Sequence, residues 1–127
     1  MSDKTIAQKL IIKEGHQVLF VNAPRGYKTL LGALPKDVVA LKAPTRPADV
    51  IQMFVADKKE LEAQPPKLKA ALALKGALWV TYYKGTSKTK TDINRDSIVE
   101  YARAIGLEGV AMISVDEDWS ALRLKIV

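Results

Sequence analysis

Short apolar runs rich in β-forming residues alternate along this chain with stretches of helical periodicity, and no other feature limits the possible folds as strongly. The runs lie at residues 17–21, 38–41, 50–55 and 77–83, and a helical pattern follows the first, third and fourth of them. Strand–helix–strand order is typical of parallel strands, whose crossover connections are short and right-handed. The order therefore predicts an α/β fold with a mainly parallel sheet and helices on both faces.

Both ends of the chain add to this pattern. Asp3 or Thr5 can cap a lead-in helix that Gly15 ends. Residues 110–115 and 121–127 have the pattern of two strands separated by a short turn, a spacing typical of an antiparallel hairpin. We therefore predict an open, mostly parallel Rossmann-like sheet of about six strands with a C-terminal antiparallel hairpin.

Local signals predict where the helices begin and end. The lead-in helix should carry Ile11 on its apolar face. Asp57, followed three residues later by Glu60, predicts a capping box for the helix after the third strand. The proline pair at residues 65–66 should break that helix, and Gly76 should end its second part.

Composition narrows the possible functions. A chain of 127 residues is the size of one domain, so we expect a single Rossmann-like α/β domain over residues 1–127. The absence of cysteine excludes disulfides, a thiolate nucleophile and cysteine-ligated zinc. No apolar run approaches a membrane span and no signal peptide is evident, so we expect a cytoplasmic protein without a membrane partner. The net charge of +6 permits nucleic acid as a partner but serves solubility equally well.

Two stretches resemble class I methyltransferase domains. DVIQMFVADKKELEAQPPKLKAALALKGALWVTYYK resembles their middle, where an Asp-led strand, a helix and a Gly-led strand follow in this order, and SVDEDWSALRLKIV is similar to their last two strands. Residues 15–24, 76–92 and 115–124 also look like a small bacterial family known only as a domain of unknown function. The resemblance implies a reduced methyltransferase-like architecture.

Several features depart from the methyltransferase pattern. The loop after the first strand should be rich in glycine so that the backbone can approach a cofactor, but it reads NAPRGY, in which Gly26 is the one glycine. Lys42 follows the second strand, where an acidic residue would hold the ribose hydroxyls. One strand and one helix of the full winding are also missing. We therefore expect no cofactor, and we predict a non-catalytic or degenerate module rather than an enzyme.

Candidate binding residues lie in the loops that should follow the first and fourth strands. The segment KGTSKTK at residues 84–90, here called the lysine loop, combines hydroxyls, a glycine and three cations, which suit phosphate contacts at the carboxyl edge of a parallel sheet. It does not match the phosphate-loop motif. For a phosphorylated small molecule or nucleotide-like anion, we predict binding by Arg25, Lys84, Ser87, Lys88 and Lys90.

An acidic turn should lie at the same edge. Asp116, Glu117 and Asp118 could hold a metal or act as acid and base, because neighbouring carboxylates push their pKa values apart. No histidine is near them in sequence, so we predict neither a catalytic residue nor a metal site. The simplest expectation is that this turn and the lysine loop pair electrostatically. His16 should lie at the opposite edge of the sheet, away from any ligand.

Two alternatives remain open at this stage. One is a structural or interaction domain that forms a homodimer, and the other is a minimal S-adenosylmethionine-dependent methyltransferase.

Among the aromatic residues, Trp79 should be part of the core and Trp119 should be partly exposed. Tyr82 and Tyr83 should point to opposite faces of the fourth strand.

Overall fold

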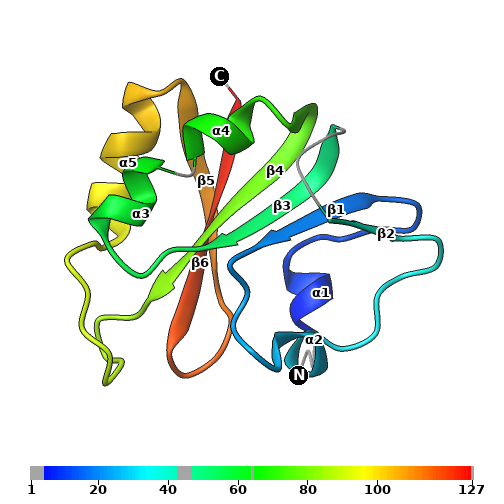
Figure 1. Ribbon diagram of the computed structural model, residues 1–127, viewed down its shortest axis with the longest axis horizontal. Helices are drawn as coiled ribbons and strands as arrows, with labels where there is room; N and C mark the ends of the chain where they lie inside the picture. The colour runs from blue at the N-terminus through cyan, green and yellow to red at the C-terminus, as the bar shows by residue number, and fades with distance from the viewer. Residues whose placement is uncertain (1–4, 43–46, 64, 127) are drawn as a thin grey trace.

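Six strands form one twisted sheet in the computed structural model, which describes residues 5–42, 47–63 and 65–126 (Figure 1). The strands are β1 (Gln17–Val21), β2 (Val39–Leu41), β3 (Ala48–Phe54), β4 (Leu72–Tyr83), β5 (Leu107–Ser114) and β6 (Trp119–Ile126). Their order is β2-β1-β3-β4-β6-β5, in which the first four are parallel and β6 runs antiparallel to both β4 and β5. The predicted fold class, with its C-terminal hairpin, is confirmed.

Within the described residues, five helices are distributed over the two faces of this sheet. They are α1 (Ile6–Lys9), α2 (Tyr27–Leu31), α3 (Lys58–Ala63), α4 (Pro65–Lys69) and α5 (Arg95–Ala104). Alternate residues of β3 and β4 face opposite sides, so the core divides into two clusters, one with α3, α4 and α5 and the other with α1 and α2 (Figure 1). No helix within the described residues is long and apolar enough to cross a membrane.

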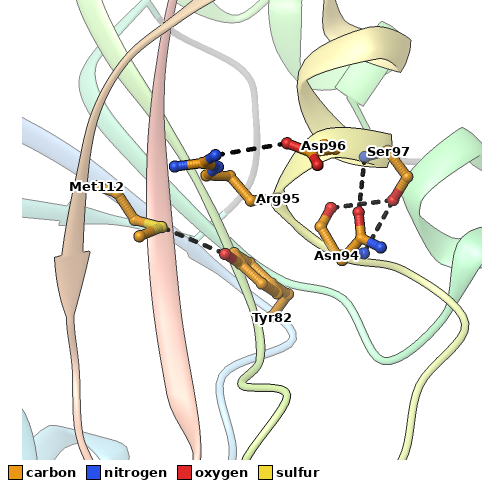
Figure 2. Close-up of polar contacts among 6 residues, drawn as sticks. All are labelled: Tyr82, Asn94, Arg95, Asp96, Ser97 and Met112. Atoms are coloured by element: carbon orange, nitrogen blue, oxygen red, sulfur yellow. Dashed lines mark hydrogen bonds and ion pairs between the residues drawn. The ribbon is translucent and has the colours of Figure 1, made fainter.

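Reciprocal capping boxes fix the start of two of the described helices, α1 and α5. Thr5 caps α1 and forms a reciprocal capping box with Gln8. Asn94 caps α5 in the same way with Ser97, as Figure 2 shows beside the ion pair of Arg95 with its neighbour in the first turn. The start of α5 is thereby fixed at the end of the loop that follows β4.

The prediction that Gly76 ends a helix was wrong. The helical segment stops at Lys69, and β4 already begins at Leu72, which pairs with Ala48 before the ladder shifts register. A Cβ atom at Gly76 would lie 2.9 Å from the Leu72 side chain and 3.0 Å from the Ala48 carbonyl oxygen. This glycine therefore permits close strand packing. β3 also begins at Ala48, two residues before the predicted run at residues 50–55. Residues 43–46, between the second and third predicted strands, lie outside the described residues.

The prediction that Ile11 packs on the apolar face of the first helix was also wrong. The helix ends at Lys9 with Leu10 as its C-cap, and the Ile11 side chain is 40% exposed. The Ile11 backbone has a φ of 60°, a left-handed conformation that is a genuine outlier for a β-branched residue. The helix end instead depends on Trp79, whose indole Nε1 donates to the Leu10 carbonyl oxygen at 3.1 Å.

Candidate functional site

The carboxyl ends of β1, β3 and β4 meet the start of β6 at one edge of the sheet, at the lower left in Figure 1. A hollow of about 390 Å³ lies at this edge. We call it the aromatic hollow, and it is lined by Asn22, Pro24, Phe54, Ala56, Glu60, Tyr83 and Trp119. Ligands of open α/β sheets bind at this edge, so the hollow is the first candidate site.

Three aromatic rings pack together at this hollow, with Trp119 and Tyr83 partly exposed and Phe54 buried. The Trp119 ring stacks on Tyr83 with centroids 4.0 Å apart, and it meets Phe54 edge to face at 5.1 Å. The Tyr27 ring packs edge to face against Phe54, with ring centroids 4.8 Å apart. The faces of such rings carry negative electrostatic potential and attract cations. The rings therefore suit a positively charged ligand better than the anion predicted from the sequence.

The acidic turn has a structural role that sets the position of Trp119. Asp116 Oδ1 accepts backbone N–H bonds from Asp118 at 2.8 Å and from Trp119 at 2.9 Å. Asp118 Oδ1 in turn accepts a hydrogen bond from the Ser87 hydroxyl at 2.9 Å, and its backbone oxygen accepts one from the Lys84 N–H at 2.8 Å. The turn and the lysine loop thus hold each other and the tryptophan in place.

Glu60 contributes the carboxylate of the hollow. Asp57 Oδ1 accepts the Glu60 N–H at 2.9 Å, which is half of the predicted capping box. The other half is missing, because no hydrogen bond among the described residues joins the Glu60 carboxylate to the Asp57 backbone. The Glu60 side chain instead lines the aromatic hollow and is partly buried there. Sequence reasoning missed this residue because the capping pattern already accounted for it.

A buried polar chain lies beneath the hollow. The Tyr27 hydroxyl donates to Gln52 Oε1 at 2.6 Å, and Gln52 Nε2 donates to Thr81 Oγ1 at 3.0 Å. Burial raises the pKa of Tyr27 well above its ordinary value, although the hydrogen bond to Gln52 opposes this. The protonated phenol therefore ties α2 to β3 and β4. Its sequence signal is a glutamine and a threonine inside otherwise apolar strands.

A second hollow of about 490 Å³ adjoins the first and shares Ala56 and Tyr83 with it. Asp57, Lys90 and Asp92 line it together with two threonines of the same loop. Asp92 Oδ1 accepts the N–H of a residue of α3 at 2.7 Å, so the loop after β4 is fixed against that helix. The second hollow carries groups of both charges.

Tyr82 points away from both hollows, as predicted from strand alternation. Its hydroxyl donates to the Met112 sulfur at 3.3 Å on the face covered by α5 (Figure 2). Burial raises the pKa of Tyr82, while the nearby Arg95 opposes this. Tyr83 is consequently the one tyrosine of the pair that faces the edge. The predictions for Trp79, which is 1% exposed, and for the partly exposed Trp119 are confirmed too.

The five predicted anion-binding residues do not surround one hollow. Arg25 is exposed after β1 and lines neither hollow, and Lys88 is exposed on the lysine loop. Ser87 is buried and engaged within the structure, whereas Lys90 lines the second hollow. Lys84 lies at the root of the loop, beside Tyr83.

The predicted ion pairing of the lysine loop with the acidic turn was wrong. In the part of the chain that the structure describes, no salt bridge joins them, and Glu117 is exposed. The Lys84 ammonium donates instead to the Ser114 hydroxyl at 2.6 Å, and the remaining contacts are the hydrogen bonds of Ser87 and Asp118. Hydrogen bonds rather than ion pairs therefore join the lysine loop to its neighbours at this edge.

Comparison with known proteins identifies the fold. No protein-family model matches the chain, and no curated protein matches it. Among solved structures, it is similar to a SAM-dependent methyltransferase from Aquifex aeolicus, with 17% identity, a TM-score of 0.63 and coverage of 95% of this chain and 89% of the other. A TehB-like SAM-dependent methyltransferase from Corynebacterium glutamicum matches with 15% identity, a TM-score of 0.62 and coverage of 99% and 90%. DhpI, solved as its complex with SAH, matches with 13% identity, a TM-score of 0.65 and coverage of 95% and 82%.

Two of these neighbours are SAM-dependent methyltransferases. At such identities the likeness establishes the fold, which is the methyltransferase-like Rossmann arrangement that the sequence resembles. The matches contradict two predictions, that of a non-catalytic anion-binding module and the expectation against an enzyme. They favour the minimal methyltransferase that was the alternative.

Proposed function

We propose that this chain is a minimal S-adenosylmethionine-dependent methyltransferase that binds its cofactor in the aromatic hollow. The observation that carries the proposal is the lining of that hollow, in which aromatic rings and the Glu60 carboxylate meet at the carboxyl edge of a methyltransferase-like sheet. The solved complex of DhpI with SAH supports a cofactor of this type. Under this proposal, the nucleotide-like partner predicted from the sequence is an adenosine derivative.

The residues present fit a sulfonium cofactor. A cation over an aromatic face gains roughly 0.5–2 kcal/mol, and the partly exposed rings of Trp119 and Tyr83 line the hollow, with the buried Phe54 packed against Trp119. The volume of about 390 Å³ lies in the usual range for small-molecule sites. Glu60 is the carboxylate among the lining residues, and its oxygens can accept hydrogen bonds from ammonium or hydroxyl groups.

Lys42 and the loop that contains Gly26 depart from the methyltransferase pattern, so the proposed site must bind the cofactor differently at these two places. Lys42 is exposed at the end of β2 and does not line the hollow, so β2 supplies no carboxylate for the ribose. We assign that acceptor role to Glu60, which enters from α3. Gly26 has a φ of 84°, and a Cβ atom added to it would meet nothing within 4 Å, so the first crossover keeps an open backbone approach with a single glycine.

The methyl acceptor belongs in the second hollow. When bound, S-adenosylmethionine supplies an electrophilic methyl group, and the attacking atom of the acceptor must lose a proton during or after transfer. Asp57 and Asp92 line the hollow that shares Tyr83 with the cofactor site. Their carboxylates can accept that proton, while Lys90 can bind an anionic part of the acceptor.

Isothermal titration calorimetry tests the proposal with S-adenosylmethionine and S-adenosylhomocysteine as ligands. Glu60→Gln should weaken both ligands about tenfold, since a charge-assisted hydrogen bond contributes roughly 1.5–3 kcal/mol. Trp119→Leu should weaken S-adenosylmethionine more than its demethylated product, because only the former carries the sulfonium charge. Glu117→Gln, which alters an exposed carboxylate of the acidic turn, is the matched control and should bind as wild type. Absence of binding by the folded wild-type chain to either ligand would overturn the proposal.

A specific observation also supports the homodimer alternative. β5 is the outer strand of the sheet, and Val110 and Met112 on it are 45% and 49% exposed. Unpaired edge strands with apolar side chains readily pair with a second copy. We propose such pairing, which sedimentation velocity tests: Val110→Lys should yield monomers, and a monomeric wild-type chain would contradict the proposal. A cytoplasmic location stays a prediction from the sequence.

A further inference from the structure

A third hollow lies at the amino edge of the sheet, at the opposite end of the strands from the aromatic hollow. It has a volume of about 260 Å³ and lies between the segment after α1 and the first residues of β3 and β4. We call it the basic pocket, and the lining residues that matter are Ile11, Lys13, His16, Asp49, Lys75 and Arg123. Three cationic side chains thus face a single carboxylate.

Arg123 is the central residue of this pocket. It lies on β6 opposite Trp79, and its Nε is buried without a hydrogen-bond partner among the described residues. The two salt bridges found within the described residues, Arg95 with Asp96 and Lys125 with Glu108, are both exposed and involve no side chain of the pocket. The Nε of this partly buried guanidinium is therefore a donor that an anion in the pocket can satisfy.

The other polar groups of the pocket are arranged for the same kind of ligand. His16 Nδ1 accepts the Lys13 N–H at 3.1 Å, which leaves Nε2 as the protonated donor of the neutral ring. The Asp49 carboxylate accepts the Gln17 N–H at 2.8 Å through Oδ2, and it forms no salt bridge with the pocket cations. Lys75 is exposed at the mouth of the pocket. The pocket therefore offers more donors than acceptors, and its side chains carry a net positive charge.

The backbone is strained at Ile11, one of the residues that line the basic pocket. The Ile11 N–H bonds to the Gln8 carbonyl oxygen and the Ile12 N–H bonds to that of Ala7, which is the hydrogen-bond pattern of a Schellman cap. Ile11 occupies the left-handed position of that cap, where glycine is usual, with a φ of 60°. Strained residues of this type cluster at ligand sites. The strain places the Ile11 side chain on the wall of the pocket.

We propose that the basic pocket binds a small phosphate-type oxyanion, either free or as the phosphoryl group of a small molecule. Arg123 and Lys75 supply charge, and His16 Nε2 supplies a neutral donor. The size of the pocket favours a ligand smaller than a nucleotide cofactor. The proposal does not depend on the methyltransferase assignment, because the two sites lie at opposite ends of the strands.

Thermal unfolding of the full chain tests this site with 10 mM potassium phosphate against potassium chloride of equal ionic strength. Phosphate should raise the melting temperature of the wild type by several degrees. Arg123→Met should lose this rise without loss of stability in chloride, because an apolar side chain of similar length replaces an uncompensated charge. The exposed Arg103→Met on α5 is the matched control and should keep the full rise.

A second variant and a second ligand keep the test decisive. Lys75→Ala alters an exposed residue and should reduce the phosphate effect even if Arg123→Met fails to fold. Glycerol phosphate in place of inorganic phosphate distinguishes an esterified ligand from the free ion. An absent rise with both ligands, or an unchanged rise in both pocket variants, would overturn the proposal. Calorimetric S-adenosylmethionine binding by Arg123→Met, expected to equal that of wild type, separates its failure from that of the cofactor site.

Discussion

The two edges of this sheet present opposite chemistry to a ligand. At the carboxyl edge, stacked and edge-to-face rings around Trp119 meet the Glu60 carboxylate, which is a surface for a cation. At the amino edge, Arg123 and two lysines face one engaged carboxylate, which is a surface for an anion. One strand contributes to both, because Trp119 and Arg123 lie at an even spacing on β6 and point to the same face.

The comparison shows that net charge is a poor guide to where a charged ligand binds. The lysine loop is the most basic loop of the chain, yet its Ser87 and backbone groups make the contacts that fix it, and Lys88 is exposed. Arg123, whose Nε is buried without a partner among the described residues, instead meets Lys13 and Lys75 in a pocket formed from the segment after α1, from β4 and from β6, far apart in sequence. Burial and unsatisfied bonding, rather than local charge density, distinguish the two edges.

The largest expected effect separates the two tryptophans. Trp79→Ala should lower the free energy of unfolding by about 3–5 kcal/mol, because it empties a fully buried site and removes the bond to Leu10 that holds α1 over the basic pocket. Trp119→Ala should cost only about 1–2 kcal/mol, since its ring is partly exposed. Urea unfolding followed by circular dichroism measures both.

Equal losses of unfolding free energy for Trp79→Ala and Trp119→Ala would contradict the proposed difference between the two edges of the sheet. If Trp119→Ala destabilises the chain as much as Trp79→Ala, the aromatic hollow is part of the core and not a binding surface. The phosphate response of Trp119→Ala should also stay at the wild-type value, because the two edges are separate sites.

The order of the elements could be predicted because each strand and helix has its own local spacing of apolar residues. Both tryptophans were also placed correctly, since strand alternation and ring size decide their burial. The two hollows could not be predicted in the same way. Glu60 satisfied a local capping pattern that competed with its place in the site, and Arg123 meets Lys13 only through the register of β6 against β4 and the end of α1. Such register is a long-range property with no signal in one sequence.

The next effect concerns the buried chain beneath the carboxyl edge. Tyr27→Phe should lower the free energy of unfolding by about 1–3 kcal/mol, because Gln52 Oε1 loses its donor. Burial raises the pKa of Tyr27 in the folded state, so its contribution to stability is fully present below about pH 10 and is lost as the pH rises further. Urea unfolding at pH 7 and at pH 10.5 should therefore show a shallower decline for Tyr27→Phe than for wild type. Burial also raises the pKa values of Tyr82 and Tyr101, which contribute to the slope that remains.

A smaller effect tests how the carboxyl edge is held. Ser87→Ala removes the bond to Asp118 and the bond that the Ser87 oxygen accepts from the Thr89 N–H, and it should cost about 1–2 kcal/mol. Raising the salt concentration from 50 to 500 mM should leave this cost unchanged, because no ion pair within the described residues joins the loop to the turn. Lys88→Ala is the control and should stay within about 0.5 kcal/mol of wild type. A strong salt dependence would restore the ion-pairing interpretation.

The smallest effect compares the left-handed residues of the two edges, Asn22 and Ile11. Asn22 has a φ of 58°, which asparagine tolerates, so Asn22→Gly should change stability by less than about 0.5 kcal/mol. At Ile11, glycine and alanine both remove the side chain, but only glycine adopts a φ of 60° without penalty. Ile11→Gly should therefore be more stable than Ile11→Ala by about 1 kcal/mol in urea unfolding. If alanine equals glycine there, the backbone is not strained, and the basic pocket rests on its uncompensated arginine alone.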